Sequence, residues 1–330
     1  MKTKLLSIGL SAAASMALAH AASASLFYEP FDYSNGTLAT STPASGGNTN
    51  NTAPSSVTVN ATTFNNTNVW TNGSNPSGTV ITGDLSYPNL PTTNTGHMVQ
   101  LTGAAKNPDR IAIGDFPQDS TIWFSMLLQV PTGVSSFGST GAGSFLAGFQ
   151  YNPTTVGAST TMTDTSAGGA GVLTIHKDAA GTGYNLGIGY RDINSGTSRI
   201  FETDELTAGT TYLVVGSLAI NAGDFNDVAK LWINPDPTAA APGTPSAVSD
   251  NSVIHDAHDY FYNNTSGALL DTHIRSFYLR SNASEPSKIN LDNIRIGSSY
   301  ADVNAVPEPT SVVMLGLGAL GALVRRRRTA

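Results

Sequence analysis

The chain has 330 residues, no cysteine, 33 glycines and only 12% charged residues. This composition favours turns and strands over long helices, because Glu, Lys and Arg drive surface helix formation, and the lack of cysteine excludes disulfides and cysteine-ligated metals. Without the two N-terminal lysines and four C-terminal arginines, ten basic residues face 23 acidic ones, a net charge of −13. Such a charge disfavours binding to nucleic acid or to anionic membranes.

The first 24 residues have the three regions of a secretory signal peptide. Lysines flank the start, an apolar run follows over 5–19, and small residues then cluster around Ala22-Ser23-Ala24. This order predicts export and cleavage after Ala24, with Ala19, Ala21 and Ala22 as alternatives. A permanent N-terminal anchor is disfavoured because the run is shorter than the ~20 residues that a membrane span needs.

Residues 25–305 alternate short apolar runs with turns rich in Gly, Asn, Ser and Thr. Many short strands separated by turn signals predict an all-β domain, here a jelly-roll sandwich of two antiparallel sheets. We expect segment 27–32 to pair with a strand from the end of the domain. Segments 34–75 and 234–250 lack strand patterning, and 234–250 is predicted to be loop. The predicted strands are 121–130, 144–151, 171–177, 184–191, 199–202, 212–220, 228–233, 276–280 and 288–297.

Two groups of residues carry metal-binding side chains. His255, Asp256, His258 and Asp259 form the denser group, with Asp271 and His273 downstream, and we interpret it as a polar loop although the donors suit zinc. Asp224, Asn226 and Asp227 offer oxygens for calcium. Asn and Asp also dominate turns through local hydrogen bonds, so a turn is favoured and a structural calcium remains the alternative.

Paired carboxylates would be needed for glycoside hydrolysis. Glu202, Asp204 and Glu205 cluster, and Asp115 and Asp119 flank a proline. We interpret the first three as solvated acids at the end of a strand. No nucleophile elbow or phosphate-binding loop is found, so we expect no catalytic residue and no cofactor.

Three tryptophans are candidates for stacking on sugar rings. Trp123 and Trp232 lie within apolar strands, which predicts that both pack in the core. Trp70 lies in a polar segment, Asn-Val-Trp-Thr-Asn-Gly, and is predicted to be the exposed one.

The last 25 residues, 306–330, have the features of a second targeting segment. Pro307-Glu308-Pro309 precedes an apolar stretch over 311–324, and Arg325, Arg326, Arg327 and Arg328 follow. We predict a transmembrane helix over 311–324 with the arginines held on the cytoplasmic side. The stretch is short for a span, which favours processing over permanent anchorage.

This tail resembles the PEP-CTERM sorting signal of Gram-negative bacteria, in which the membrane protease exosortase recognises the motif. Segments such as FYEPFDYSNGTL, TIWFSMLLQV, NDVAKLWINPDP and LDNIRIGSSYADV also resemble a recurrent group of PEP-CTERM proteins whose domain is similar to the concanavalin/laminin-G-like jelly roll. The resemblance implies the fold, the exported setting and exosortase and the secretion machinery as partners. It implies no reaction.

The sequence therefore predicts a non-enzymatic surface or extracellular protein, transiently anchored in the inner membrane, with a role in the exopolysaccharide matrix through glycan binding. Two alternatives are a polysaccharide-acting enzyme on the same scaffold and a calcium-stabilised adhesive module. Nucleic acid is not expected as a partner.

Overall fold

The structure is a computed structural model of the chain. It describes residues 27–38, 56–59, 62–65, 70, 76–90, 96–102, 108–134, 143–150, 169–177, 183–192, 196–222, 226–250, 274–281 and 286–304. Ser25–Asn304 form one compact unit, and all the elements below belong to it.

The larger sheet is antiparallel and has nine strands, in the order β15-β14-β13-β8-β17-β6-β5-β2, with β1 paired to β17. The long central strands β8, β13 and β17 are almost entirely buried, as expected for strands covered on both faces. The bounds are β1 Phe27–Glu29, β2 Gly36–Thr37, β5 Gly78–Thr82, β6 His97–Leu101, β8 Ser120–Gln129, β13 Thr211–Ile220, β14 Val228–Ile233, β15 Ala247–Asp250 and β17 Ile289–Gly297.

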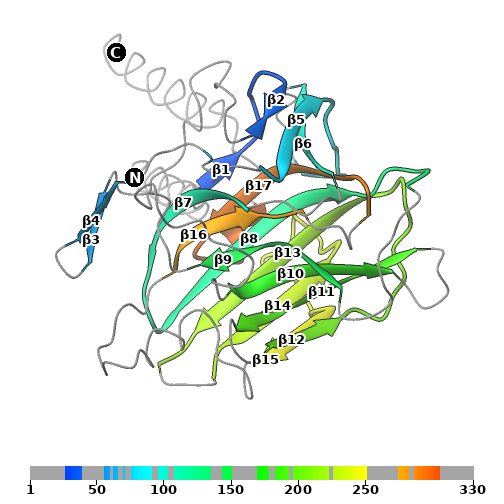
Figure 1. Cartoon of the computed structure of the whole chain (residues 1–330). Coiled ribbons are helices and arrows are strands. Elements are labelled where there is room, and N and C mark those ends of the chain that lie inside the picture. The colour runs from blue at the N-terminus through cyan, green and yellow to red at the C-terminus, as the bar shows by residue number, and fades with distance from the viewer. Residues whose placement is uncertain are drawn as a thin grey trace, which may run out of the picture. The chain divides into compact units, whose positions relative to one another are not determined.

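The smaller sheet has six antiparallel strands in the order β12-β11-β10-β9-β16-β7. Figure 1 shows it stacked on the larger sheet as a second layer. A separate hairpin joins β3 (Ser56–Val59) to β4 (Thr62–Asn65), and a short helix, α2, spans Tyr300–Asn304. The bounds of the six strands are β7 Asp109–Phe116, β9 Ser144–Gln150, β10 Gly169–Lys177, β11 Tyr184–Asp192, β12 Gly196–Phe201 and β16 Ile274–Leu279.

The main hydrophobic core fills the space between the two sheets. Phe124 of the nine-stranded sheet meets Phe149 and Phe277 of the six-stranded sheet, with ring centroids 5.7 and 5.8 Å from its own. All three rings are fully buried, and ring–ring contacts of this kind add to the ~25 cal/mol per Å² gained by burying apolar surface. This packing joins the layers into one sandwich.

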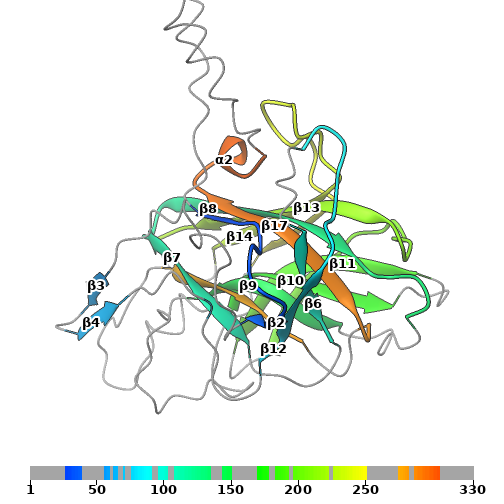
Figure 2. The same cartoon turned by 90° about the horizontal axis from the view of Figure 1, so that it is seen from above.

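A second hydrophobic cluster covers the outer face of the nine-stranded sheet. Trp123 of β8 stacks on Trp232 of β14 with centroids 5.1 Å apart, and Tyr300 of α2 lies 5.9 Å from Trp123. Figure 2 shows α2 on this side of the sheet, away from the six-stranded layer. We call this group the outer cluster: Leu85, Leu90, Leu127, Leu213, Val215, Trp232, Tyr300 and Val303, with Trp123, Tyr87 and Met98 at its rim.

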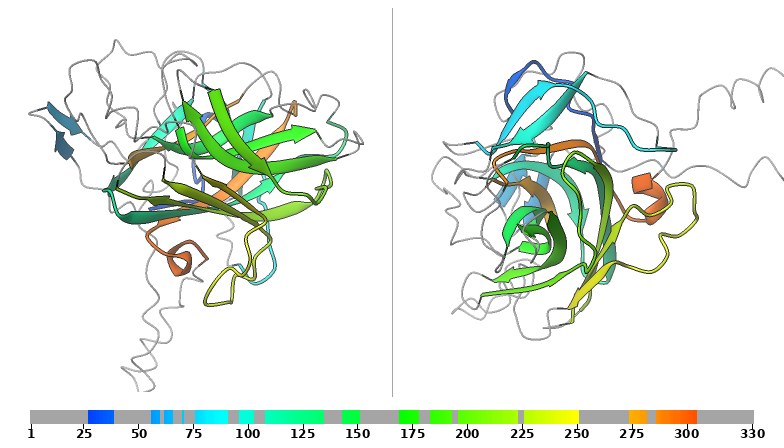
Figure 3. Two further views of the ribbon diagram at one scale, coloured as in Figure 1. Left: turned by 90° about the horizontal axis from the view of Figure 1, so that it is seen from below. Right: turned by 90° about the vertical axis from the view of Figure 1, so that its right-hand side faces the viewer.

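Helix α2 is hydrogen-bonded to the loop that follows β14, and the two lie side by side in Figure 3. The Tyr300 hydroxyl donates to the Asp236 carbonyl (2.8 Å), and the Asn304 amide donates to the Pro237 carbonyl (3.0 Å). The Ser125 hydroxyl of β8 donates to the Val303 carbonyl (2.6 Å). These bonds fasten the end of the domain to the central strands.

The sequence-based prediction of an all-β sandwich of two antiparallel sheets is confirmed, including the pairing of segment 27–32 with the last strand, seen as β1 against β17. The prediction that 234–250 is all loop is wrong, because Ala247–Asp250 forms edge strand β15. Short strands β2, β3 and β4 also lie within 34–75, where polar composition hid them. The predicted apolar helix over 311–324 lies outside the described residues.

Candidate functional site

The outer face of the six-stranded sheet carries cationic, aromatic and amide side chains around one small buried apolar cluster. In β16, Phe277 and Leu279 belong to the core, whereas Tyr278 points the other way, into a small cluster with Phe145 and Val172. Because side chains alternate along a strand, the neighbouring outward positions follow from the register. They are Arg110, Phe145, Gly148, Gln150, Val172, Thr174, His176, Asn185, Gly187, Arg199, Phe201, Ser276 and Tyr278, with Arg280 just after β16.

Phe145 lies between two arginines. The Arg199 guanidinium lies 4.2 Å from the ring centroid, and the Arg280 guanidinium 5.6 Å from it. Arg199 is further fixed by donating to the Gly143 carbonyl at 2.9 Å. A register shift between Leu173 and Thr174 brings Phe145 opposite Thr174, as a β-bulge does when it re-aims a side chain. The result is a rigid aromatic ring flanked by positive charge.

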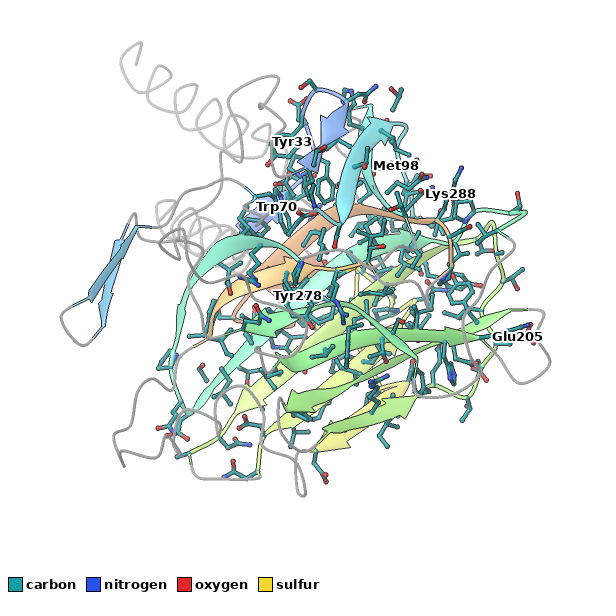
Figure 4. All side chains as sticks on the ribbon, viewed as in Figure 1. Tyr33, Trp70, Met98, Glu205, Tyr278 and Lys288 are labelled. Atoms are coloured by element: carbon teal, nitrogen blue, oxygen red, sulfur yellow. The ribbon has the colours of Figure 1, made fainter. Side chains whose placement is uncertain are left out.

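Glycines let two other rings lie flat on the sheet. A Cβ at Gly148 would come within 3.0–3.2 Å of the Tyr278 ring and hydroxyl, and a Cβ at Gly187 would collide with the Phe201 ring at 2.6 Å. Phe201 also stacks on His176, with centroids 3.8 Å apart and planes 12° apart. Figure 4 labels Tyr278, which lies on β16 between β9 and the edge strand β7. Close backbone approach at glycine is a common reason for its presence in strands.

Two buried polar atoms of uncharged side chains on this face have no hydrogen-bond partner in the structure. They are the Thr174 hydroxyl and the Gln150 side-chain carbonyl oxygen, and the two residues are 0% and 3% exposed. An unsatisfied buried polar group costs about 1–3 kcal/mol, so native proteins keep few of them. Within the described part of the chain, this face therefore holds unused hydrogen-bonding capacity at a destabilising cost.

Glu202, Asp204 and Glu205 were predicted to lie at the end of a strand, and they do follow one, because β12 ends at Phe201. Asp204 and Glu205 are exposed, as predicted, and Figure 4 shows Glu205 at the margin of the sheet. The prediction is wrong for Glu202, which is buried and accepts a bond from the Leu186 amide at 3.2 Å. Burial raises the pKa of Glu202 to about 7.

The other acids considered for chemistry do not gather. Asp119 is exposed and accepts a bond from the Ala222 amide (3.1 Å), while only the backbone of Asp115 is described. Asn226 donates to the Ala222 carbonyl and Asp227 accepts from the Asn221 amide, which supports the predicted turn. Asp224 lies outside the described residues, as do His255, Asp256, His258, Asp259, Asp271 and His273. Over the described ranges, no group of three His, Cys, Asp or Glu could hold a metal.

The prediction that Trp70 is exposed is wrong. Trp70 is 2% exposed and lies 6.3 Å from the Phe31 ring, in the main core. Its indole N–H donates at 3.0 Å to Glu29, whose carboxylate also accepts from the Tyr33 hydroxyl and the Phe31 amide. A buried carboxylate needs such donors, so Trp70 has a structural partner that its polar neighbours in sequence concealed. Figure 4 shows Trp70 and Tyr33 on the same side of the domain.

Trp123 and Trp232 pack as predicted, although in the outer cluster instead of the core between the sheets. Trp232 is buried and donates its indole N–H to the Gly243 carbonyl (3.0 Å), whereas Trp123 is half-buried. Neither tryptophan faces the six-stranded sheet.

The architecture belongs to the class of two-sheet jelly rolls. Residues 305–328 match the PEP-CTERM protein-sorting motif family, so the chain carries this motif and is exported to the cell surface through transient membrane anchoring. The motif residues Pro307, Glu308, Pro309 and Arg325–Arg328, like the cleavage residues Ala22 and Ala24, lie outside the described residues. In the part of the chain that is described, no helix is long and apolar enough to cross a membrane.

Solved structures with a similar sheet arrangement include carbohydrate-active and carbohydrate-recognising proteins. An endo-β-1,4-glucuronan lyase from the fungus Trichoderma reesei is 13% identical, with 68% of this chain and 89% of the lyase covered and a TM-score of 0.39. The calreticulin globular domain of T. cruzi is 11% identical, with 79% and 95% covered and a TM-score of 0.40. The carbohydrate recognition domain of Emp46p is 9% identical, with 68% and 88% covered and a TM-score of 0.29. At these values the likeness carries no argument about function.

A comparison with curated proteins finds no significant match. The assignment of a candidate site therefore depends on the residues of this chain alone. Sequence reasoning missed it, because its side chains come from strands more than 150 residues apart in the chain, from Arg110 to Arg280. One signal was available: the basic residues of the domain concentrate in the segments that form this sheet.

Proposed function

We propose that this exported chain is a non-catalytic protein of the exopolysaccharide matrix that binds glycan on the outer face of the six-stranded sheet. The observation that carries the proposal is the stacked pair of His176 and Phe201, both only half buried, on the same face as the half-buried Arg199. Sugar rings present apolar C–H faces and hydroxyl edges, and carbohydrate binding needs both aromatic surface and directed polar groups. The outer cluster of the nine-stranded sheet offers few directed polar groups.

A glycan array on the full chain, purified in neutral detergent, tests the binding. We expect defined glycans to bind and Phe201→Ala to weaken them at least tenfold, since this change removes the half-buried ring of the stacked pair. Tyr87→Ala serves as the matched control, because Tyr87 is a half-buried tyrosine at the rim of the outer cluster. An array that stays blank, or equal losses for both variants, would contradict the proposal.

The absence of catalysis needs its own measurement. Incubation of the chain with bound glycans should release no reducing ends and no unsaturated sugar ends. If degradation is seen, the triple change of Glu202, Asp204 and Glu205 to their amides separates the alternatives. Loss of activity in that variant would establish the enzyme on these acids, and retained activity would place catalysis elsewhere; either outcome would overturn the non-catalytic proposal.

A further inference from the structure

The stacked pair of His176 and Phe201 joins two strands that are not neighbours. His176 lies in β10, Phe201 ends β12, and β11 runs between these two strands. Because neighbouring strands lie about 4.8 Å apart, the backbones of β10 and β12 are separated by roughly 10 Å. The two ring centroids are only 3.8 Å apart. Both side chains therefore lean over β11, where Gly187 is directly opposite Phe201 and Asn185 is directly opposite His176.

Gly187 leaves the space over β11 that the pair occupies. A Cβ at this position would lie 2.6 Å from Cδ1 of the Phe201 ring and 2.9 Å from the carbonyl oxygen of Ile200. Both distances are shorter than real Cβ contacts, so the ring and the edge strand β12 would have to move. Gly187 is not among the glycines with a positive φ, so its backbone conformation does not call for glycine. The contact with Phe201 is the physical reason for glycine here.

A second glycine, Gly143, also contacts the pair. A Cβ there would lie 3.0 Å from Cζ of Phe201 and 3.2 Å from Cβ of His176. Gly143 has a φ of 68°, which favours glycine for its own backbone, so Gly187 is the position where only the rings decide the residue.

A ring that covers a glycine on the neighbouring strand can also protect the backbone of a sheet. That protection does not need a second ring, and His176 stands opposite Asn185 instead of a glycine. The two stacked rings are half buried, so together they keep aromatic surface in contact with solvent. Aromatic surface of this kind is what the apolar face of a sugar ring contacts.

We infer that Gly187 is a positioning residue of the glycan site, because its missing side chain lets His176 and Phe201 meet over β11 and act as one binding surface. The inference rests on the proposed glycan binding and adds the residue that arranges the rings for it. A side chain at position 187 pushes Phe201 off β11 and separates the rings, although both remain in the chain. Binding is then lost without any change to a residue that touches the sugar.

The test compares Gly187→Ala with Gly78→Ala in the full chain, purified in neutral detergent. Gly78 is the matched control, because it is a buried strand glycine of the larger sheet whose added Cβ would lie 3.2 Å from the Leu38 side chain. The probe is whichever oligosaccharide of glucose, galactose, mannose or glucuronic acid binds most tightly on the array. We expect Gly187→Ala to weaken its binding about tenfold and Gly78→Ala to change it less than twofold, while both variants lower the melting temperature.

Proton NMR gives a readout that a general loss of stability would not change. The ring protons of His176 should resonate upfield in the wild type, because they lie over the Phe201 ring. His176→Gln identifies these signals among those of the six histidines. Gly187→Ala should move them to the positions of an unstacked histidine, and Gly78→Ala should leave them in place.

The outcomes separate the inference from the function on which it rests. Wild-type binding in Gly187→Ala would overturn the positioning role and leave glycan binding intact, whereas a blank array for the wild type would overturn both. Equal weakening by the two glycine variants would assign the effect to stability and contradict the inference. Should Gly187→Ala fail to fold by thermal melting, His176→Gln removes one ring and keeps Gly187, and binding equal to wild type would then show that the pair is not needed.

Discussion

The two sheets of this sandwich share one core but differ on their outer faces. The nine-stranded sheet buries its outer face under α2 and the outer cluster, where Trp123, Trp232 and Tyr300 pack together. The six-stranded sheet places arginines, flat rings and unsatisfied polar atoms on its outer face. The first arrangement lowers the free energy of the folded state and the second raises it. We expect the ligand on the face that lowers the stability of the fold. Functional sites commonly keep residues that do not give the most stable packing.

The largest expected effect is on the packed face. Trp232→Ala should destabilise the domain by about 3–5 kcal/mol, because it removes a buried ring, leaves a cavity against Trp123 and breaks the bond to the Gly243 carbonyl. Thermal melting should show a fall of roughly 10 °C, while glycan binding below the transition stays unchanged. Lost binding in the folded variant would show that the two faces are not independent.

A smaller effect is expected from pH, because burial raises the pKa of several acids, among them Glu29 of β1. Burial raises the pKa of Asp292 in β17 and of Glu202 beyond β12 to about 7. The folded protein then binds more protons than the unfolded chain between roughly pH 4 and 7, so stability from these groups is full at low pH and is lost as the pH rises through 7. Melting temperatures should be higher at pH 5 than at pH 8.

The two acids can be compared directly. Asp292 accepts bonds from the Leu85 and Asn293 amides, and Leu85 belongs to the outer cluster, so Asp292→Asn should flatten the pH dependence most. Glu202→Gln should flatten it less, because Glu202 is less deeply buried than Asp292. A pH profile that is unchanged in both variants would show that other groups set it.

The smallest expected effect has the opposite sign. Thr174→Val should stabilise the domain by about 1 kcal/mol, because it replaces a buried hydroxyl without a partner by a methyl group. The matched variant Thr211→Val on the nine-stranded sheet removes a hydroxyl that accepts from Gln129 and should destabilise slightly. Stabilisation of the folded state by both changes, or by neither, would remove the contrast between the faces.

Much of the fold was predictable because the central strands have a clear pattern in the sequence. Residues 121–130 and 212–220 are apolar runs of strand length bounded by turn residues, and they became β8 and β13 within one residue. Edge strand β15 was missed because Ala, Val, Ser and Asp form a weak strand signal. Its pairing with β14 comes from the larger sheet and is not encoded locally.

The candidate site could not be predicted because it depends on register. Phe145 meets Arg199 and Arg280 only after a register shift in β9 and β10 turns it away from the core. No local pattern reports which of two faces an arginine in a strand will take when a bulge intervenes. Trp70 shows the reverse error, since its polar neighbours suggested exposure while its partner, Glu29, lies 41 residues earlier.

The fastening of α2 has a mechanical consequence. The sorting motif begins at residue 305, immediately after Asn304, so while the chain is anchored any pull from the membrane enters the domain through α2 and then β17. In antiparallel pairs the hydrogen bonds lie across the strand axis, and β17 is bonded to β1, β6 and β8. A load along β17 would be shared by many bonds in shear instead of peeling them one by one. A protein that binds a polymer on one sheet and is anchored to the membrane through a strand of the other would thus be attached where the sheet resists force best.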